Sequence, residues 1–308
     1  MLRARRSSGI RITAAICLDG ADDAAGAAVD SLIRQTLPKD EYEILLIGGA
    51  ARFAEAPNLR RVESPAEPNG GCCLALELAQ APLVAFLDPR AVAEPGWLAS
   101  FCRTFAQFGE AAPVVGGRVL PRWTADRPDW LGDELLPELS LVDLGEEARF
   151  LDAGERISAV NIAYRKAQVN RSTPCRAESG GFAGTAADGS PLALPAPISA
   201  AQAGRVYDPL AAAELLIPDD WLTQAWFRKK AAWRAVADFA RAAPANDAEI
   251  AERWRAVKKF FFECPPDERT VRGLVLRQDD PHRFRQQIAA VYDSTYCLLA
   301  GLGEDEYD

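Results

Sequence analysis

The feature that most constrains this chain is the alternation of short apolar runs with helix-forming segments over its first hundred residues. The apolar runs are Ile10–Leu18, Tyr42–Ile47, Leu59–Val62 and Leu83–Leu87, and the helix-forming segments are Ala24–Thr36 and Cys72–Gln80. A strand buried on both faces forms a continuous apolar run, and parallel strands need a crossover connection between them. The pattern therefore predicts βαβ units and an α/β fold with a mostly parallel sheet flanked by helices.

The rest of the chain divides into an irregular middle and a helical end. Residues 116–220 are rich in proline, and residues 171–204 are mostly Ala, Gly, Ser and Pro, which predicts a long surface loop. We therefore predict an α/β domain over residues 8–220 and a helical C-terminal region over residues 221–308.

Start signals and periodicity support helices in that C-terminal region. Asn246, with Glu249 three residues later, is typical of a helix start. An apolar stripe at helical spacing follows at Ile250, Trp254, Val257 and Phe261. A further helix is predicted over Phe284–Leu299, ending at Gly301.

Charge and targeting signals exclude several classes of protein. With 35 basic and 44 acidic residues the net charge is −9, so nucleic acid is not an expected partner. The apolar stretch Ile12–Leu18 is too short for the core of a signal peptide, and no run approaches the length of a membrane span. Seven cysteines without a CxxC pair indicate free thiols in a reducing compartment. These features predict a cytoplasmic protein.

Three groups of motifs occur in a fixed order along the chain. They are the helix end Asp30-Ser31-Leu32-Ile33-Arg34-Gln35-Thr36, the segment LVAFLDPRAVAEPGWL over Leu83–Leu98, and a series over Gly116–Pro121, Arg127–Leu131, Leu139–Gly145, Val160–Arg165, Arg205–Pro209 and Ile217–Arg228. Over about residues 10–235 the chain thereby resembles the family 2 glycosyltransferases. The resemblance implies a GT-A fold and inverting transfer of a sugar from a nucleotide donor.

The metal motif of that family is altered here. The resemblance implies a D-x-D motif after the strand at Leu83–Leu87, where Mn²⁺ or Mg²⁺ would offset the donor diphosphate. The motif reads Asp88-Pro89-Arg90, and arginine neither loses its charge nor supplies an oxygen ligand. We therefore predict no metal site. Two roles stay open for Arg90: it could neutralise the diphosphate, with Asp88 also on the donor side, or pair with Asp88 or Glu94 as a surface arginine.

The catalytic base of the family is also altered. The resemblance implies a Glu-Asp pair at the positions that hold Ser190 and Pro191, and neither residue can take a proton from an acceptor hydroxyl. Asp188 and Glu178 are nearby acids that could act as the base, or could be solvated loop carboxylates.

Further site residues follow from the resemblance alone. Asp19 could contact the donor nucleobase from the first loop, or cap the turn that follows. Asp129, Trp130 and Asn161 would line the acceptor side. Gly48-Gly49-Ala50 stands where the family usually has an acid that reads the nucleobase.

These changes predict a glycosyltransferase-like protein of polysaccharide or glycoconjugate synthesis whose transfer activity is reduced or lost. A divergent transferase that still binds a nucleotide-sugar donor, and a non-catalytic scaffold or partner of an active glycosyltransferase, stay open as alternatives. The helical region combines many aromatic and basic residues, which is typical of peripheral contact with a membrane face or of partner docking. The same aromatics could instead pack the helices onto the sheet domain.

Overall fold

The computed structural model describes residues 9–18, 25–48, 53, 55–63, 70–169, 182–185, 191–193, 204–241 and 246–302. The chain forms two compact units. The sheet unit comprises Met1–Arg122, Ser140–Gly184 and Leu192–Leu216, and the helical unit comprises Trp123–Leu139, Thr185–Pro191 and Ile217–Asp308. The segment that contains Asp129 and Trp130 therefore belongs to the helical unit.

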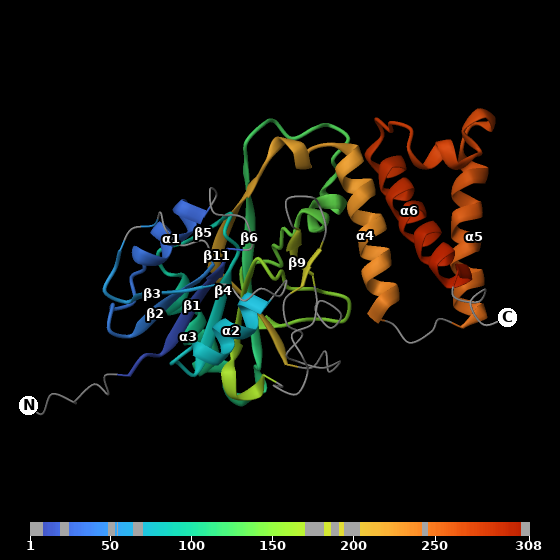
Figure 1. Ribbon diagram of the computed structural model, residues 1–308. Helices are drawn as coiled ribbons and strands as arrows, with labels where there is room; N and C mark the ends of the chain where they lie inside the picture. The colour runs from blue at the N-terminus through green and yellow to red at the C-terminus, as the bar shows by residue number, and fades with distance from the viewer. Residues whose placement is uncertain are drawn as a thin grey trace, which may run out of the picture. The chain divides into compact units, whose positions relative to one another are not determined.

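The sheet unit is built on one large sheet with the order β3-β2-β1-β4-β8-β6-β11-β5, and β7 pairs with β11 (Figure 1). The strands are β1 (Ile12–Cys17), β2 (Tyr42–Ile47), β3 (Leu59–Val62), β4 (Leu83–Leu87), β5 (Ala91–Ala93), β6 (Val114–Trp123), β7 (Arg149–Phe150), β8 (Asn161–Arg165) and β11 (Arg205–Ile217). Strands β3, β2, β1 and β4 are parallel, whereas β8 is antiparallel to both β4 and β6. The predicted α/β fold is confirmed.

The helices of the sheet unit are α1 (Ala25–Ile33), α2 (Gly70–Leu78) and α3 (Trp97–Phe108), with 3-10 turns at Gly109–Ala111 and Lys166–Gln168. Every residue of β2 and β4 is buried, as their uninterrupted apolar sequences require. Helix α2 covers the parallel strands: its Cys72, Ala75 and Leu76 pack in one core with β1, β2 and β4.

The middle of the chain is more regular than its prolines suggest. Strands β6, β8 and β11 lie in the region predicted to be rich in loops, so that prediction is wrong there. Within the predicted surface loop, β9 (Phe182–Thr185) pairs with β10 (Pro191–Ala193) in a separate two-stranded sheet. The remainder of residues 171–203 lies outside the described residues.

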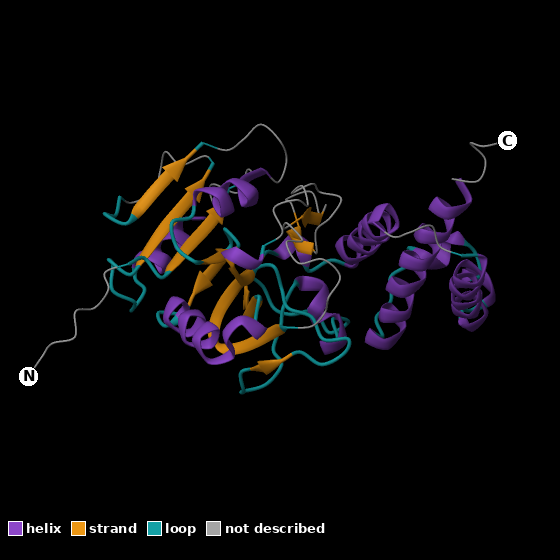
Figure 2. Ribbon diagram, turned by 90° about the horizontal axis from the view of Figure 1, so that it is seen from below, coloured by secondary structure: helices purple, strands orange, loops and turns teal. Residues whose placement is uncertain are grey.

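Three long helices dominate the helical unit: α4 (Gln224–Arg241), α5 (Asp247–Glu263) and α6 (Pro281–Leu302). Short 3-10 turns occur at Asp133–Leu139, Asp219–Trp221, Pro266–Glu268 and Val271–Leu274. Helix α6 packs against both α4 and α5, as Figures 1 and 2 show. The predicted start of α5 is confirmed, because the Asn246 side chain accepts a 3.0 Å hydrogen bond from the Glu249 backbone N–H.

The described residues also test the sequence predictions about membrane-spanning segments and about the cysteines. Within the described ranges, no helix has the length and apolarity needed to cross a membrane. Cys17, Cys72, Cys102, Cys264 and Cys297 are thiols outside any disulfide, as predicted, whereas Cys73 is disulfide-bonded and contradicts that prediction.

Candidate functional site

The carboxyl end of β4 holds the altered Asp88-Pro89-Arg90 motif in a tight turn. The Asp88 backbone N–H donates to the Val160 carbonyl at 2.9 Å, and the Asp88 carbonyl accepts from the Ala91 N–H at 2.9 Å. The Arg90 carbonyl accepts from the Leu216 N–H at 3.1 Å, which ties the turn to β11. The Asp88 side chain is only 2% exposed. The motif therefore has a fixed backbone and a buried carboxylate.

Arg90 occupies both oxygens of that carboxylate. Its Nε donates to Asp88 Oδ1 and its Nη2 to Asp88 Oδ2, each at 2.9 Å. The Arg90 backbone N–H adds a 2.8 Å bond to Oδ1. The Arg90 side chain is itself 14% exposed, so the pair lies largely away from water. Of the two roles left open by the sequence, pairing with Asp88 is present, although not at the surface.

The strand end does not fit a divalent metal site. A hard cation requires several oxygen ligands, and the position of the second carboxylate holds a guanidinium. A metal at Asp88 would have to break the two-pronged ion pair and then lie beside a fixed positive charge. Among the described residues, no three His, Cys, Asp or Glu side chains are grouped as metal ligands.

Asn161 begins β8 and is completely buried. Its Oδ1 accepts a 2.7 Å hydrogen bond from the Trp97 indole Nε1. Its Nδ2 donates to the carbonyls of Arg118 at 2.9 Å and Ala211 at 2.7 Å. The amide thus joins α3, β6 and β11 and has no exposed atom for an acceptor. We infer a structural role for Asn161 in place of the acceptor-side role that the resemblance implied.

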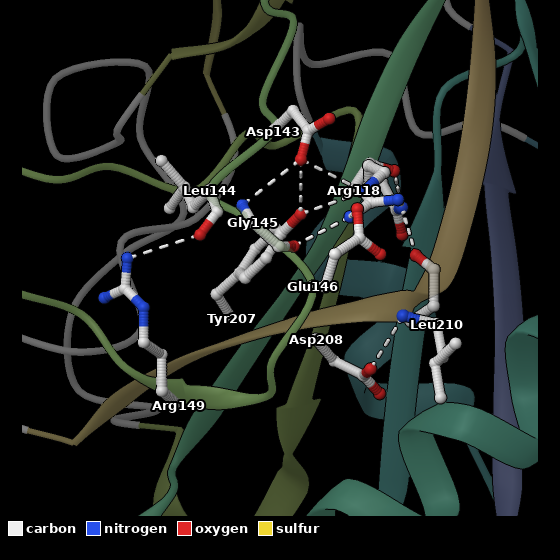
Figure 3. Close-up of polar contacts among 11 residues, drawn as sticks. Arg118, Asp143, Leu144, Gly145, Glu146, Arg149, Tyr207, Asp208 and Leu210 are labelled. Atoms are coloured by element: carbon white, nitrogen blue, oxygen red, sulfur yellow. Dashed lines mark hydrogen bonds and ion pairs between the residues drawn. The ribbon is translucent and has the colours of Figure 1, made fainter.

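A polar cluster joins β6 and β11 to the loop after Leu141 (Figure 3). Arg118 Nε lies 3.2 Å from the Tyr207 hydroxyl and 3.1 Å from Asp143 Oδ1. Its Nη2 donates to the Gly145 carbonyl and to Glu146 Oε1, both at 2.7 Å. Burial lowers the pKa of Arg118, but the bonds to Tyr207 and Glu146 outweigh it, so the net pKa shift is upward. The cluster therefore holds a permanent cation that is paired with Asp143 and Glu146.

Beside that cluster, Asp208 is buried and holds β11 to α3. Its Oδ2 accepts from Thr104 Oγ1 at 2.6 Å. Its Oδ1 accepts from the Leu210 N–H at 2.9 Å, as Figure 3 shows. The Gly-Gly-Arg and Val-Tyr-Asp-Pro motifs are part of the family resemblance, but the sequence alone predicts no contacts for their polar residues. Their polar side chains stabilise the sheet unit, because each forms a hydrogen bond to a neighbouring element.

No family model matches the chain, and no curated protein matches it. Solved structures do match. The mannosyltransferase PcManGT from Pyrobaculum calidifontis, in complex with GDP-Man and Mn²⁺, aligns over 98% of this chain and 88% of its own at a TM-score of 0.52 and 13% identity. The chain has a glycosyltransferase fold. S. aureus TarS 1–349 in complex with UDP aligns over 97% of this chain and 93% of its own, at 12% identity and a TM-score of 0.41.

On this glycosyltransferase fold, the predicted site residues fall in different places. Asp88 and Arg90 come together at one strand end. Asp129 is exposed in the helical unit, and Trp130 is buried there against the rings of Phe227 and Phe284. The remaining predicted residues, Asp19, Glu178 and Asp188, lie outside the described residues.

The aromatic residues of the helical unit divide into packing and exposed groups. Trp221, Trp226, Phe227 and Phe260 are buried. Phe262, in contrast, is 72% exposed at the end of α5. Membrane contact, partner docking and packing onto the sheet domain therefore stay predictions for these aromatics.

Proposed function

We propose that this protein is a family 2 glycosyltransferase-like protein of nucleotide-sugar-dependent polysaccharide or glycoconjugate synthesis, in which metal-dependent sugar transfer is reduced or lost. The observation that carries the proposal is the ion pair between Asp88 and Arg90 at the end of β4. The pair stands where the family resemblance implies a metal-binding D-x-D motif.

The reasoning rests on charge at the leaving diphosphate. A divalent ion normally offsets that charge, and the PcManGT structure contains both GDP-Man and Mn²⁺. Here the cation fixed beside Asp88 is a guanidinium whose Nε and Nη2 already bond the carboxylate. A donor diphosphate that drew Arg90 away from Asp88 would leave a buried carboxylate without its partner, which is strongly unfavourable.

Donor, catalytic-base and acceptor roles follow for the predicted site residues. If a donor binds, Asp88 and Arg90 lie on its diphosphate side and Asp19 on its nucleobase side, with Asp188 or Glu178 as the catalytic base. Asp129 and Trp130 stay acceptor-side candidates. No metal takes part in this scheme.

The second candidate function is a non-catalytic partner of an active glycosyltransferase. The ion pair between Asp88 and Arg90 favours this candidate, because each charge is already offset by the other without a ligand. Peripheral membrane contact is part of this alternative: Phe262 is exposed and follows the exposed Lys258 and Lys259 on α5. Exposed aromatic and basic side chains on one helix suit an anionic membrane face.

The test is calorimetry with UDP-, GDP- and TDP-sugars, in Mn²⁺ and in EDTA, on the natural protein and on Arg90→Asp. We expect no effect of Mn²⁺ on the natural protein, because Asp88 is already paired. Arg90→Asp restores two carboxylates at the strand end, and we expect it to bind Mn²⁺, measured by the loss of the free-ion paramagnetic resonance signal.

Arg90→Gln is the matched control, since it removes the guanidinium without adding a second carboxylate. It should not take up Mn²⁺. Donor binding by the natural protein only in the presence of Mn²⁺ would contradict the proposal. Donor binding in EDTA that Arg90→Gln abolishes would instead identify a transferase that uses arginine in place of the metal.

A further inference from the structure

The helical unit contains a hollow of about 290 Å³ at the start of α4. It is lined by Trp130, Thr223, Gln224, Arg228 and Arg277. Two of these five side chains are guanidinium groups, and none of them is acidic. A hollow of this size is at the lower end of small-molecule sites, so it suits one compact group rather than a whole nucleotide.

Arg228 is a partly buried cation without a counterion among the described residues. Its one bond there runs from Nη1 to Gln287 Oε1, at 3.2 Å, and that acceptor is a neutral amide. Burial lowers the pKa of Arg228, which reflects the cost of holding its charge away from water. An incoming anion would offset that cost, because a partly desolvated charge is stabilised by an opposite charge.

The walls of the hollow are held in place by two glutamines. Gln287 is completely buried and its Nε2 donates to the carbonyls of Gly273 at 2.7 Å and Leu276 at 2.9 Å. Gln224 accepts from the Gln278 backbone N–H at 3.0 Å and donates to the Gln278 carbonyl. These bonds fix the backbone on both sides of Arg277, so the second guanidinium is presented to the hollow by a fixed segment.

Trp130 forms a rigid wall. Its ring centroid lies 5.5 Å from that of Phe227 and 4.9 Å from that of Phe284, and both contacts are edge-to-face. Asp279 is the nearest competitor for Arg277, at 2.8 Å from its Nε. Both partners of that pair are about four-fifths exposed, so the pair is weak and leaves the Nη groups of Arg277 available.

We propose that this hollow binds an oxyanion, a phosphate or carboxylate group, between Arg228 and Arg277. Guanidinium groups match the two oxygens of such anions with paired N–H donors. The lining residues all belong to the helical unit, whereas Asp88 and Arg90 belong to the sheet unit. The oxyanion could be free phosphate or the acidic group of a sugar, and a sugar source rests on the proposed function.

The test is calorimetry of the full chain with inorganic phosphate, glucose 6-phosphate, glucuronate and neutral glucose. We expect binding of the charged probes and none of glucose. Arg228→Gln and Arg277→Gln should each weaken binding about tenfold, the usual effect of losing one charged hydrogen bond. Arg255→Gln is the matched control, because Arg255 is an exposed arginine on α5 that donates to the Ala251 carbonyl of its own helix. This variant should bind the probes as the natural protein does.

The outcomes separate the ligand sources and the two proposals. Glucose 6-phosphate binding more tightly than phosphate assigns the site to an acidic sugar, and equal binding assigns it to the free anion. The proposed site is contradicted if none of the charged probes binds. It is also contradicted if Arg228→Gln and Arg277→Gln both bind the probes as the natural protein does. If Arg228→Gln lowers the melting temperature, Arg277→Gln decides, since its side chain is exposed. Charged-probe binding without any nucleotide-sugar binding would keep this site and favour the role of a non-catalytic partner.

Discussion

Replacing Asn161 by leucine is expected to destabilise the sheet unit by about 4 kcal/mol. The substitution leaves the Trp97 indole N–H and the carbonyls of Arg118 and Ala211 buried without this partner. Each buried polar group left unpaired costs about 1–3 kcal/mol. Urea unfolding followed by circular dichroism measures the change, and hydrogen exchange of the β6, β8 and β11 amides locates it in the sheet.

Asn246→Ala provides the comparison for that variant. It also removes one asparagine side-chain hydrogen bond, to the Glu249 N–H, but at the exposed start of α5. A lost helix cap costs about 1 kcal/mol. Equal destabilisation by the two variants would show that the buried amide of Asn161 is not the centre that joins the strands.

Gly117→Ala is expected to prevent the sheet unit from folding stably. A Cβ atom at this position would lie 1.8 Å from the Ala211 carbonyl oxygen and 2.3 Å from Asn161 Nδ2. The first of these is backbone of the neighbouring strand, so relief requires β6 and β11 to move apart. We expect the free energy of unfolding to fall by more than about 4 kcal/mol, which is typical of severe core disruption. Soluble yield and the thermal melting curve measure it.

Gly26→Ala is the matched control. It has the same change of one methyl group, but an added Cβ at Gly26 meets nothing within 4 Å. Gly26 lies in α1, where alanine is favoured over glycine by up to about 1 kcal/mol. This variant should be as stable as the natural protein or more so. A Gly117→Ala protein with a natural melting curve would refute the close approach of β6 and β11.

The parallel half of the sheet could be predicted from the sequence with accurate boundaries. Tyr42–Ile47, Leu59–Val62 and Leu83–Leu87 are the observed limits of β2, β3 and β4. For β2 and β4, burial on both faces leaves an uninterrupted apolar run that a single sequence reveals directly.

The antiparallel half was hidden by residues that usually interrupt strands. Gly116, Gly117 and Pro121 occur within β6, and Pro209 occurs within β11. Gly117 is required because the neighbouring strand comes too close for any side chain, and that contact spans about ninety residues of sequence. Local pattern cannot show such a requirement.

For the candidate site, the sequence predicted where the residues lie better than it predicted which side chains pair. It placed Asp88 and Arg90 at one strand end, but it could not decide whether the guanidinium faces a ligand or its own carboxylate. Asn161 illustrates the opposite error. Its motif resembled a binding signature, while its three partners come from elements distant in the sequence and indicate a structural role.

The route of the chain limits how this protein can be dissected genetically. A stop codon after Leu216 would remove α4 and α6 but keep Trp123–Leu139, and Trp130 would then lose Phe227 and Phe284. Val119 and Val142 hydrogen-bond each other in both directions, so the two ends of that segment leave the sheet side by side. We expect that a fragment that also lacks Trp123–Leu139, with the two ends joined by a short reverse turn, can be expressed. It would not contain Trp130 without its aromatic partners.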